Sequence, residues 1–239
     1  VAPVNAFNSE TWMSLPDIIT EAGKNPDVNC VLIRAEGRGF CGGVDIKEMQ
    51  ATEGYDALIG ANRGCYAAFA AVYDCAVPVI AAVNGLATAA GCQLVAQCDL
   101  AVASADARFA VSGINLGLFC STPAVPLTRN IGRKRAAEML FTGEFIDAET
   151  ALDWGLVNRL VPKGQALATA KEIAAQICET GPLALKAITK SLRDIQTDVR
   201  ESDAMLLSDE LANPVFASTD AKEGMRAFKE KRKANFTGQ

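Results

Sequence analysis

Strand-like runs alternate with helical stretches along this chain, and this alternation limits the possible folds more than any other feature. Four runs rich in Val, Ile and Ala predict strands: Cys30–Ala35, Val77–Val83, Leu100–Ser104 and Leu156–Val161. They are apolar on both faces, which is typical of strands that helices cover on both sides of a sheet. We therefore predict an α/β fold with mainly parallel strands.

The helical stretches fall into two groups. Those among the strands are Glu10–Glu21, Tyr55–Tyr73, Thr88–Gln97, Arg133–Phe141 and a short helix that Asp147 opens and Gly155 ends. After Pro162 only helical periodicity remains, at Gln165–Glu179, Pro182–Gln196, Val199–Ala212 and Asp220–Lys233. We expect a core over residues 1–180 and a helical segment over 181–239. Asp220 and Glu223 have the spacing of a capping box, which predicts Asp220 as an N-cap.

The 239 residues contain no histidine. Ser-His-Asp and Cys-His triads, histidine-ligated zinc and histidine general bases are therefore excluded. The net charge of −5 argues against a nucleic-acid partner, which needs clustered Lys and Arg. No run approaches the roughly 18 apolar residues of a membrane span, so we expect no membrane partner. The opening residues also lack the basic and apolar regions of a signal peptide.

Eight cysteines are spread along the chain without a C-x-x-C pair. Most of them lie inside apolar runs, which is typical of reduced, buried thiols in a reducing cytosol. Their spacing supports no metal cluster, and we expect no bound metal.

Two glycine-rich segments each follow a predicted strand. Gly37, Gly39 and Gly42 match the G-x-G-x-x-G pattern of dinucleotide-binding turns, although no acid at a strand end lies clearly about 20 residues later. The second segment, 84–94, runs into a helix. Two such turns can direct two backbone N–H groups at one point and hold a developing oxyanion. Close packing of helix on sheet is the alternative interpretation of the same small residues.

These two segments resemble motifs of the crotonase superfamily, the enoyl-CoA hydratase and isomerase family. The first motif is similar to residues 40–49, and the second to residues 78–85, 89–94 and 98–99. Later stretches, at 138–143, 151–157 and 223–233, fit in the right order. The resemblance implies a crotonase-like spiral of ββα units with a helical C-terminal segment. It also lowers the weight of the dinucleotide interpretation, because the family uses these glycines differently.

The resemblance implies an acyl-CoA substrate, with coenzyme A as part of the substrate and no separate cofactor. By motif position, the thioester oxygen lies between the backbone N–H groups of Gly42 and Ala90. The resemblance also implies that Val44, Asp45 and Ile46 border the adenine pocket.

The resemblance also concerns the helical tail. Phe228 and Lys229 are expected to reach the nucleotide of the same or a neighbouring subunit. Members of the family usually form trimers or dimers of trimers through this tail. Residues 181–239 are therefore the expected oligomerisation segment.

Two positions depart from the hydratase pattern. Gln93 and Gly113 stand where hydratases place glutamates, and isomerases also depend on the second of these. Hydration needs one carboxylate to activate water and another to deliver a proton, and neither residue exchanges protons near pH 7. We therefore doubt efficient hydration. Gln93 either orients water or a carbonyl in the active site or is a plain helix residue.

Other side chains are candidates to replace the missing acids. Cys120 and Ser121 are candidate nucleophiles, but without a neighbouring base Cys120 is better interpreted as inert packing. Asp45 is interpreted as structural or facing CoA. Glu48, Glu53 and Asp56 could supply a displaced carboxylate, although a solvated helix face is the preferred interpretation.

Two subgroups of the family share features with this chain. The loop 118–123 resembles the enoyl-CoA hydratase domain-containing proteins of mitochondrial type, which lack both glutamates, and their bacterial relatives. Residues 36–40 and 62–65 are more similar to actinobacterial crotonases of sterol-ring breakdown. We expect a bacterial cytoplasmic protein, or a mitochondrial matrix protein in a eukaryote.

We predict a protein that binds an acyl-CoA and stabilises its enolate. An acyl-CoA hydrolase, a C–C bond-cleaving crotonase and a non-catalytic acyl-CoA-binding regulator are the alternatives. A dinucleotide oxidoreductase is a distant third class.

Overall fold

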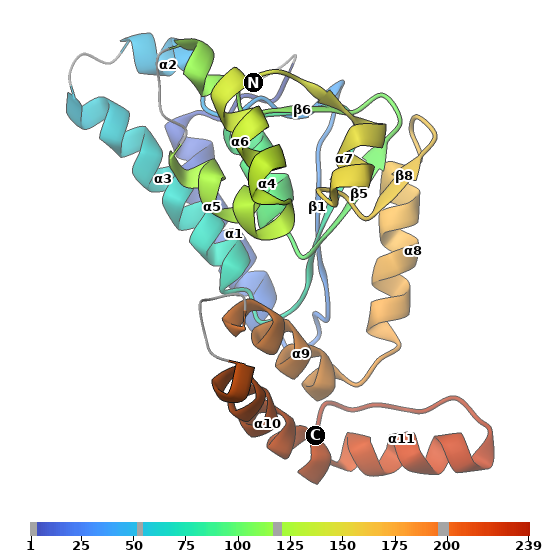
Figure 1. Cartoon of the computed structure of the whole chain (residues 1–239). Helices are drawn as coiled ribbons and strands as arrows, with labels where there is room; N and C mark the ends of the chain where they lie inside the picture. Colours follow the sequence, from blue (N-terminus) through green and yellow to red (C-terminus); the bar gives the residue numbers. More distant parts are fainter. Residues whose placement is uncertain (1–3, 52–54, 117–120, 196–200) are drawn as a thin grey trace.

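Two four-stranded sheets form the centre of the molecule (Figure 1), which is a computed structural model describing residues 4–51, 55–116, 121–195 and 201–239. The first sheet is parallel throughout, in the order β1 (Val31–Arg34), β3 (Val79–Val83), β5 (Leu100–Ser104) and β8 (Arg159–Val161). The four apolar runs predicted as strands supply these four strands.

The second sheet consists of short strands that the sequence pattern did not predict. Its order is β2 (Gly39–Cys41), β4 (Leu86–Thr88), β6 (Arg108–Ala110) and β7 (Ile146–Asp147), with only β7 antiparallel to its neighbour. Thr88 ends β4, so the helix predicted from Thr88 begins at Ala90 instead.

Successive strands go to different sheets, and helices follow each pair. After β1 and β2 come α2 (Ile46–Ala51) and α3 (Tyr55–Tyr73), and after β3 and β4 comes α4 (Ala90–Gln97). After β5 and β6 come the 3-10 helix η1 (Ser112–Leu116) and α5 (Ser121–Asn130). This ββα repeat confirms the predicted fold class.

The other helices of the core are α1 (Ser9–Lys24), α6 (Arg133–Thr142), α7 (Ala148–Trp154) and α8 (Ala166–Cys178). As predicted, Asp147 caps α7 by accepting a hydrogen bond from the Thr150 N–H at 2.8 Å, and Gly155 ends it at φ 84°.

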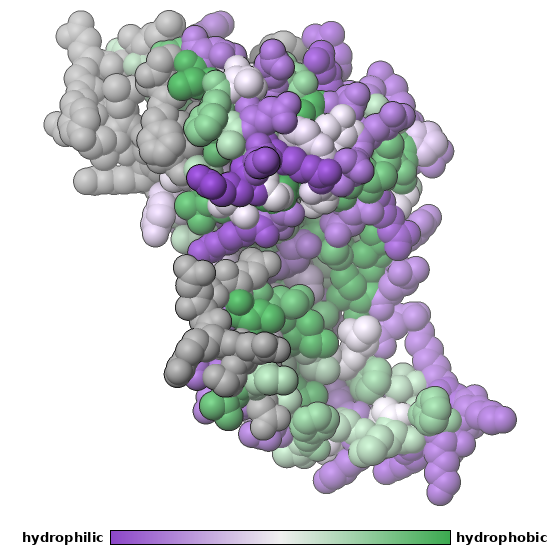
Figure 2. Space-filling model, in the orientation of Figure 1, coloured by the Kyte–Doolittle hydropathy of each residue, from purple (hydrophilic) through white to green (hydrophobic). Residues whose placement is uncertain are grey.

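Three helices extend away from the sheets at the C-terminal end of the chain: α9 (Pro182–Asp194), α10 (Glu201–Ala217) and α11 (Thr219–Glu230) (Figure 1). Arg193 attaches α9 to the core and is 8% exposed. Its guanidinium donates to the Asp99 carboxylate at 2.6 and 3.1 Å and to the backbone oxygens of Tyr73 and Cys75. Figure 2 shows hydrophobic side chains among hydrophilic ones on the coloured parts of this C-terminal end.

The start of α11 differs from the predicted capping box. Ser218 is the N-cap, because it has an extended backbone and its hydroxyl accepts from the Ala221 N–H at 3.0 Å. Asp220 instead accepts from the N–H groups of Thr237 and Gly238 at 2.7 and 2.8 Å. Glu223 binds Arg232 rather than the helix start. The two acids therefore hold the returning tail against α11.

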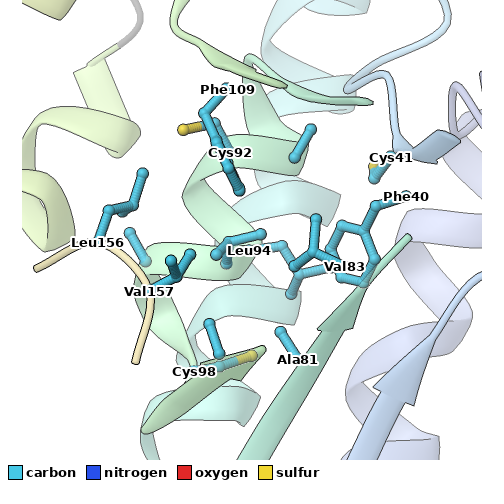
Figure 3. Packing of buried hydrophobic residues seen from close by; sticks show 14 of the residues in the cluster. Phe40, Cys41, Ala81, Val83, Cys92, Leu94, Cys98, Phe109, Leu156 and Val157 are labelled. Atoms are coloured by element: carbon cyan, nitrogen blue, oxygen red, sulfur yellow. The ribbon is translucent and has the colours of Figure 1, made fainter. Parts of the chain in front are cut away.

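The first sheet buries both faces, as its apolar runs predicted. Val79, Ala81 and Val83 face a large core with α1, α3 and α4, part of which Figure 3 shows around Leu94 and Phe109. Alternate residues Ile80 and Ala82 face α8 through Ala166 and Ala170.

Most of the described cysteines are buried. Cys41, Cys65, Cys75, Cys92 and Cys98 are buried, and none of the described cysteines forms a disulfide. Burial raises the pKa of the Cys41 thiol to about 11 and that of Cys65 to about 12. Cys178 differs from the expectation because it is exposed. Within the described ranges no helix is long and apolar enough to cross a membrane, and no acidic or thiol cluster has metal-binding geometry.

Candidate functional site

The two glycine-rich segments meet where β2 ends and α4 begins. A Cβ atom on Gly91 would overlap the carbonyl oxygen of Cys41, so the first turn of α4 lies directly against the backbone of β2. Gly43 has a φ of +89°, and a Cβ there would lie 3.0 Å from the Ala89 Cβ and 3.3 Å from the Ala90 nitrogen. Glycine at both positions allows this approach of two backbones.

The G-x-G-x-x-G pattern does not form a dinucleotide-binding turn. Gly37 precedes strand β2, Gly39 begins it and Gly42 follows it, and β2 pairs with β4. A dinucleotide-binding turn instead leads directly from a strand into a helix. Gly39 and Gly42 both pack against Val4. The dinucleotide interpretation is therefore wrong.

The start of α4 has no side-chain cap. Its N-cap, Ala89, has an unusual backbone conformation (φ 52°, ψ −122°) and a methyl side chain, which accepts no hydrogen bond. Among the described residues, none accepts a hydrogen bond from the Ala90 N–H. An uncapped helix start carries a partial positive charge and attracts anionic oxygen.

The Gly42 amide, predicted as the second donor, is already engaged. Its N–H donates to the Asn5 carbonyl oxygen at 3.3 Å. Two residues later, Val44 forms a parallel bridge with Phe7. The Phe7 N–H donates to the Gly43 oxygen, and the Phe7 oxygen accepts from the Asp45 N–H. In such a bridge the N–H of the central residue points away from its partner. The Val44 N–H therefore points away from Phe7, and no described residue accepts from it.

Gln93 lies on the same face of α4 as Ala90, three residues along the helix. Its side chain is 3% exposed, and its amide oxygen accepts from the Thr122 hydroxyl at 2.7 Å. Gly113 is buried in η1, next to Ser112, whose hydroxyl lies 3.0 Å from that of Thr88. Neither position carries a carboxylate.

The acids near β2 have structural roles. Glu48 accepts from the N–H and hydroxyl of Ser9 at 2.8 and 3.0 Å, at the first residue of α1. Asp45 accepts from the Lys47 N–H at 2.9 Å, at the start of α2. The side chains of Glu53, Asp56, Cys120 and Ser121 lie outside the described residues.

The predicted coenzyme A contacts do not come together within one chain. Val44, Asp45 and Ile46 lie at the start of α2, whereas Phe228 and Lys229 are exposed on α11 at the other end of the molecule (Figure 1). Phe228 is 87% exposed. The same-subunit alternative is therefore wrong, because α10 and α11 extend away from the core.

A pocket of about 300 Å³ opens beside Gln93, between α3, α4 and α5. The pocket was not predicted from the sequence, although its lining residues follow helical spacing on three helices. The lining residues are Tyr66, Phe69, Ala70, Tyr73 and Asp74, then Gln93 and Gln97, and then Thr122, Val125, Pro126 and Arg129. We call it the Gln93 pocket.

The family of enoyl-CoA hydratases/isomerases matches residues 2–239. This chain belongs to that family. The "Enoyl-CoA hydratase domain-containing protein 3, mitochondrial" of Xenopus laevis is 42% identical over 98% of this chain and 79% of its own length. A crystal structure of the human protein 3 has a TM-score of 0.90 at 38% identity, covering 97% of this chain and 91% of that one. The predicted resemblance to this subgroup is confirmed.

A second group of relatives carries a different name. A Rhodococcus jostii protein named "(7aS)-7a-methyl-1,5-dioxo-2,3,5,6,7,7a-hexahydro-1H-indene-carboxyl-CoA hydrolase" is 43% identical over 84% of this chain and 77% of its own length.

A crystal structure of an enoyl-CoA hydratase from Mycobacterium smegmatis has a TM-score of 0.92 at 39% identity, covering 97% of this chain and 90% of that one.

Proposed function

We propose that this family member binds an acyl-CoA thioester and stabilises its enolate between the N–H groups of Val44 and Ala90. The observation that carries the proposal is the direct approach of Gly43 to Ala90, at a helix start without a side-chain cap. Val44 replaces the predicted Gly42 as donor, because the Gly42 N–H donates to Asn5.

Such a site acts by electrostatics alone. When the thioester becomes an enolate, negative charge moves onto the carbonyl oxygen. Two fixed N–H donors and the start of α4 stabilise that charge without reorganising. One oxyanion donor contributes roughly 100- to 1,000-fold to the rate in enzymes where it has been removed.

The acid and base of a hydratase are missing, so hydration of a simple enoyl-CoA is not the proposed reaction. The Gln93 amide can orient a water molecule or a substrate carbonyl, and it cannot exchange a proton near pH 7. A hydrolase acting through an enolate is the second candidate, because one of the two relative groups carries a CoA hydrolase name.

Infrared spectroscopy of a bound thioester tests the oxyanion site directly. A saturated acyl-CoA labelled with ¹³C at the thioester carbonyl would be added to the protein, and its carbonyl band compared with that of the free ester. We expect a shift to lower frequency, because hydrogen bonds to the oxygen weaken the C=O bond. Tight binding without any shift would contradict the proposed hole.

Crotonyl-CoA hydration tests the argument from the missing carboxylates. We expect almost no loss of the conjugated enone with the natural protein, and turnover in a Gln93→Glu, Gly113→Glu double variant whose folding is confirmed by circular dichroism. Efficient hydration by the natural protein would contradict the argument. If the natural protein and the double variant both bind acyl-CoA and neither hydrates it, two functions remain, the hydrolase and the non-catalytic regulator. Release of free CoA from acyl-CoA would distinguish the hydrolase from the regulator.

We also propose a homotrimer or a dimer of trimers, formed through α9–α11. Large apolar side chains are exposed on these helices: Ile188, Leu192, Met205, Leu206, Phe216, Met225 and Phe228. In such an assembly, Phe228 and Lys229 would serve the nucleotide site of a neighbouring subunit.

A further inference from the structure

The Gln93 pocket is lined by both apolar and polar residues. Phe69, Val125 and Pro126 provide hydrocarbon surface, whereas Asp74, Gln97 and Arg129 provide polar groups. A volume of about 300 Å³ is at the lower end for ligand pockets. Because Gln93 follows Ala90 by one helical turn, the pocket begins next to the proposed oxyanion site.

Arg129 is the available cation of this pocket. No described side chain forms an ion pair or hydrogen bond with its guanidinium. Arg193 is different, because it already donates to Asp99 and to two backbone oxygens. Arg129 also lines a smaller adjoining cavity of about 130 Å³ together with Gln97 and Tyr73, so this residue borders two cavities.

The pocket lining carries one anion, Asp74, and one cation, Arg129. Asp74 repels a carboxylate at the end of an acyl group and so opposes the attraction of Arg129 for it. A ketone or hydroxyl oxygen can accept from Arg129 or Gln97 without that repulsion. A purely hydrocarbon acyl group would instead remove water from these polar groups without replacing its hydrogen bonds.

We infer that the Gln93 pocket holds the acyl group and that Arg129 selects acyl groups carrying a neutral oxygen remote from the thioester. The inference rests on the proposed function, since it names the substrate class of that site. Arg129 is thus a specificity-determining residue, and the apolar wall holds the carbon frame of the acyl group.

The test compares four coenzyme A esters by isothermal titration calorimetry. These are cyclohexanecarboxyl-CoA, its 3-oxo and 4-oxo derivatives, and its 4-carboxy derivative. Each is titrated into the natural protein, Arg129→Met and the control Arg133→Met, which changes an exposed arginine of α6 outside the pocket lining. We expect at least one keto ester to bind about tenfold more tightly than the unsubstituted ester, as one charge-assisted hydrogen bond provides.

Arg129→Met should abolish this preference, because the keto esters lose their donor and the unsubstituted ester no longer removes water from a guanidinium. Arg133→Met should keep the preference. Equal binding of the keto and unsubstituted esters by the natural protein would overturn this inference and leave the proposed function standing. Preference for the carboxy ester would overturn the choice of a neutral oxygen. If none of the four esters binds, the proposed function itself fails.

Discussion

At the scale of single residues, Gly91 determines how closely the two halves of the candidate site approach. Any side chain there meets the backbone of β2, which cannot rotate away as the end of a flexible side chain can. The uncapped amide of Ala90 lies one residue earlier, so packing and chemistry depend on the same turn.

Gly91→Ala is expected to destabilise the protein by about 1–3 kcal/mol, because overpacking forces backbone shifts. It should also weaken acyl-CoA binding by moving the Ala90 N–H. Urea unfolding and calorimetric titration measure the two effects. The control is Gly132→Ala, where no atom lies within 4 Å of the added methyl group. Similar losses in both variants would contradict the argument.

Arg193 is a single residue that attaches α9 to the core. Arg193→Met leaves the Asp99 carboxylate and two backbone oxygens without their main donor. Removing one partner of a buried pair costs about 3–5 kcal/mol, and we expect roughly the lower value because Asp99 is partly exposed. Lys163→Met, which removes an exposed pair with Asp106, should cost less than about 1 kcal/mol in the same urea titration. A similar loss of unfolding free energy in both variants would argue against this role of Arg193, which we call the Arg193 clamp.

At the scale of elements, the first sheet was predictable and the second was not. Runs such as Val77–Val83 contain enough consecutive apolar residues to predict a buried strand. The strands of the second sheet have two or three residues, which is too short for any periodicity to appear. Their order depends on contacts between segments far apart in the chain, which local propensity does not encode.

The candidate site was predicted in outline for a similar reason. The two glycine-rich segments and Ala90 were found from their motifs, and their convergence is observed. The predicted donor at Gly42 failed because its hydrogen bond to Asn5 is a tertiary contact. The Gln93 pocket needs three helices to be placed side by side, so no single stretch indicates it.

Glu223 of α11 predicts a pH dependence for the tail that folds back on this helix. The Arg232 guanidinium holds the pKa of Glu223 at about 2, below its ordinary value of 4.5. A lowered pKa in the folded state means that the contact is fully present above pH 4.5 and is lost as the pH falls toward 2. The amide resonance of Asn235, which donates to Glu223 at 3.0 Å, should follow this titration. A midpoint near 4.5 would contradict the Arg232 contact.

At the scale of the whole molecule, the C-terminal helices give the protein an extended end with exposed apolar side chains. Met205, Leu206, Phe216, Met225 and Phe228 are each at least 65% exposed. Groups of exposed apolar side chains of this kind are typical of protein interfaces.

We expect the purified protein to have a mass of three or six times 25.2 kDa by light scattering at micromolar concentration. Phe216→Asp with Phe228→Asp should shift it toward the monomer, whereas Phe141→Asp, an equally exposed change on α6, should not. A monomeric natural protein would contradict the proposed assembly.

The Arg193 clamp also has a consequence for synthesis of the chain. Arg193 binds residues that precede it by 94 to 120 positions. Asp99 therefore leaves the ribosome long before Arg193, its counter-charge, has been synthesised. Until α9 emerges, the Asp99 carboxylate has the Val79 N–H as a backbone partner, without a counter-charge. The nascent core therefore remains electrostatically incomplete until late in translation, and truncations ending before residue 193 should depend more strongly on chaperones than the full chain.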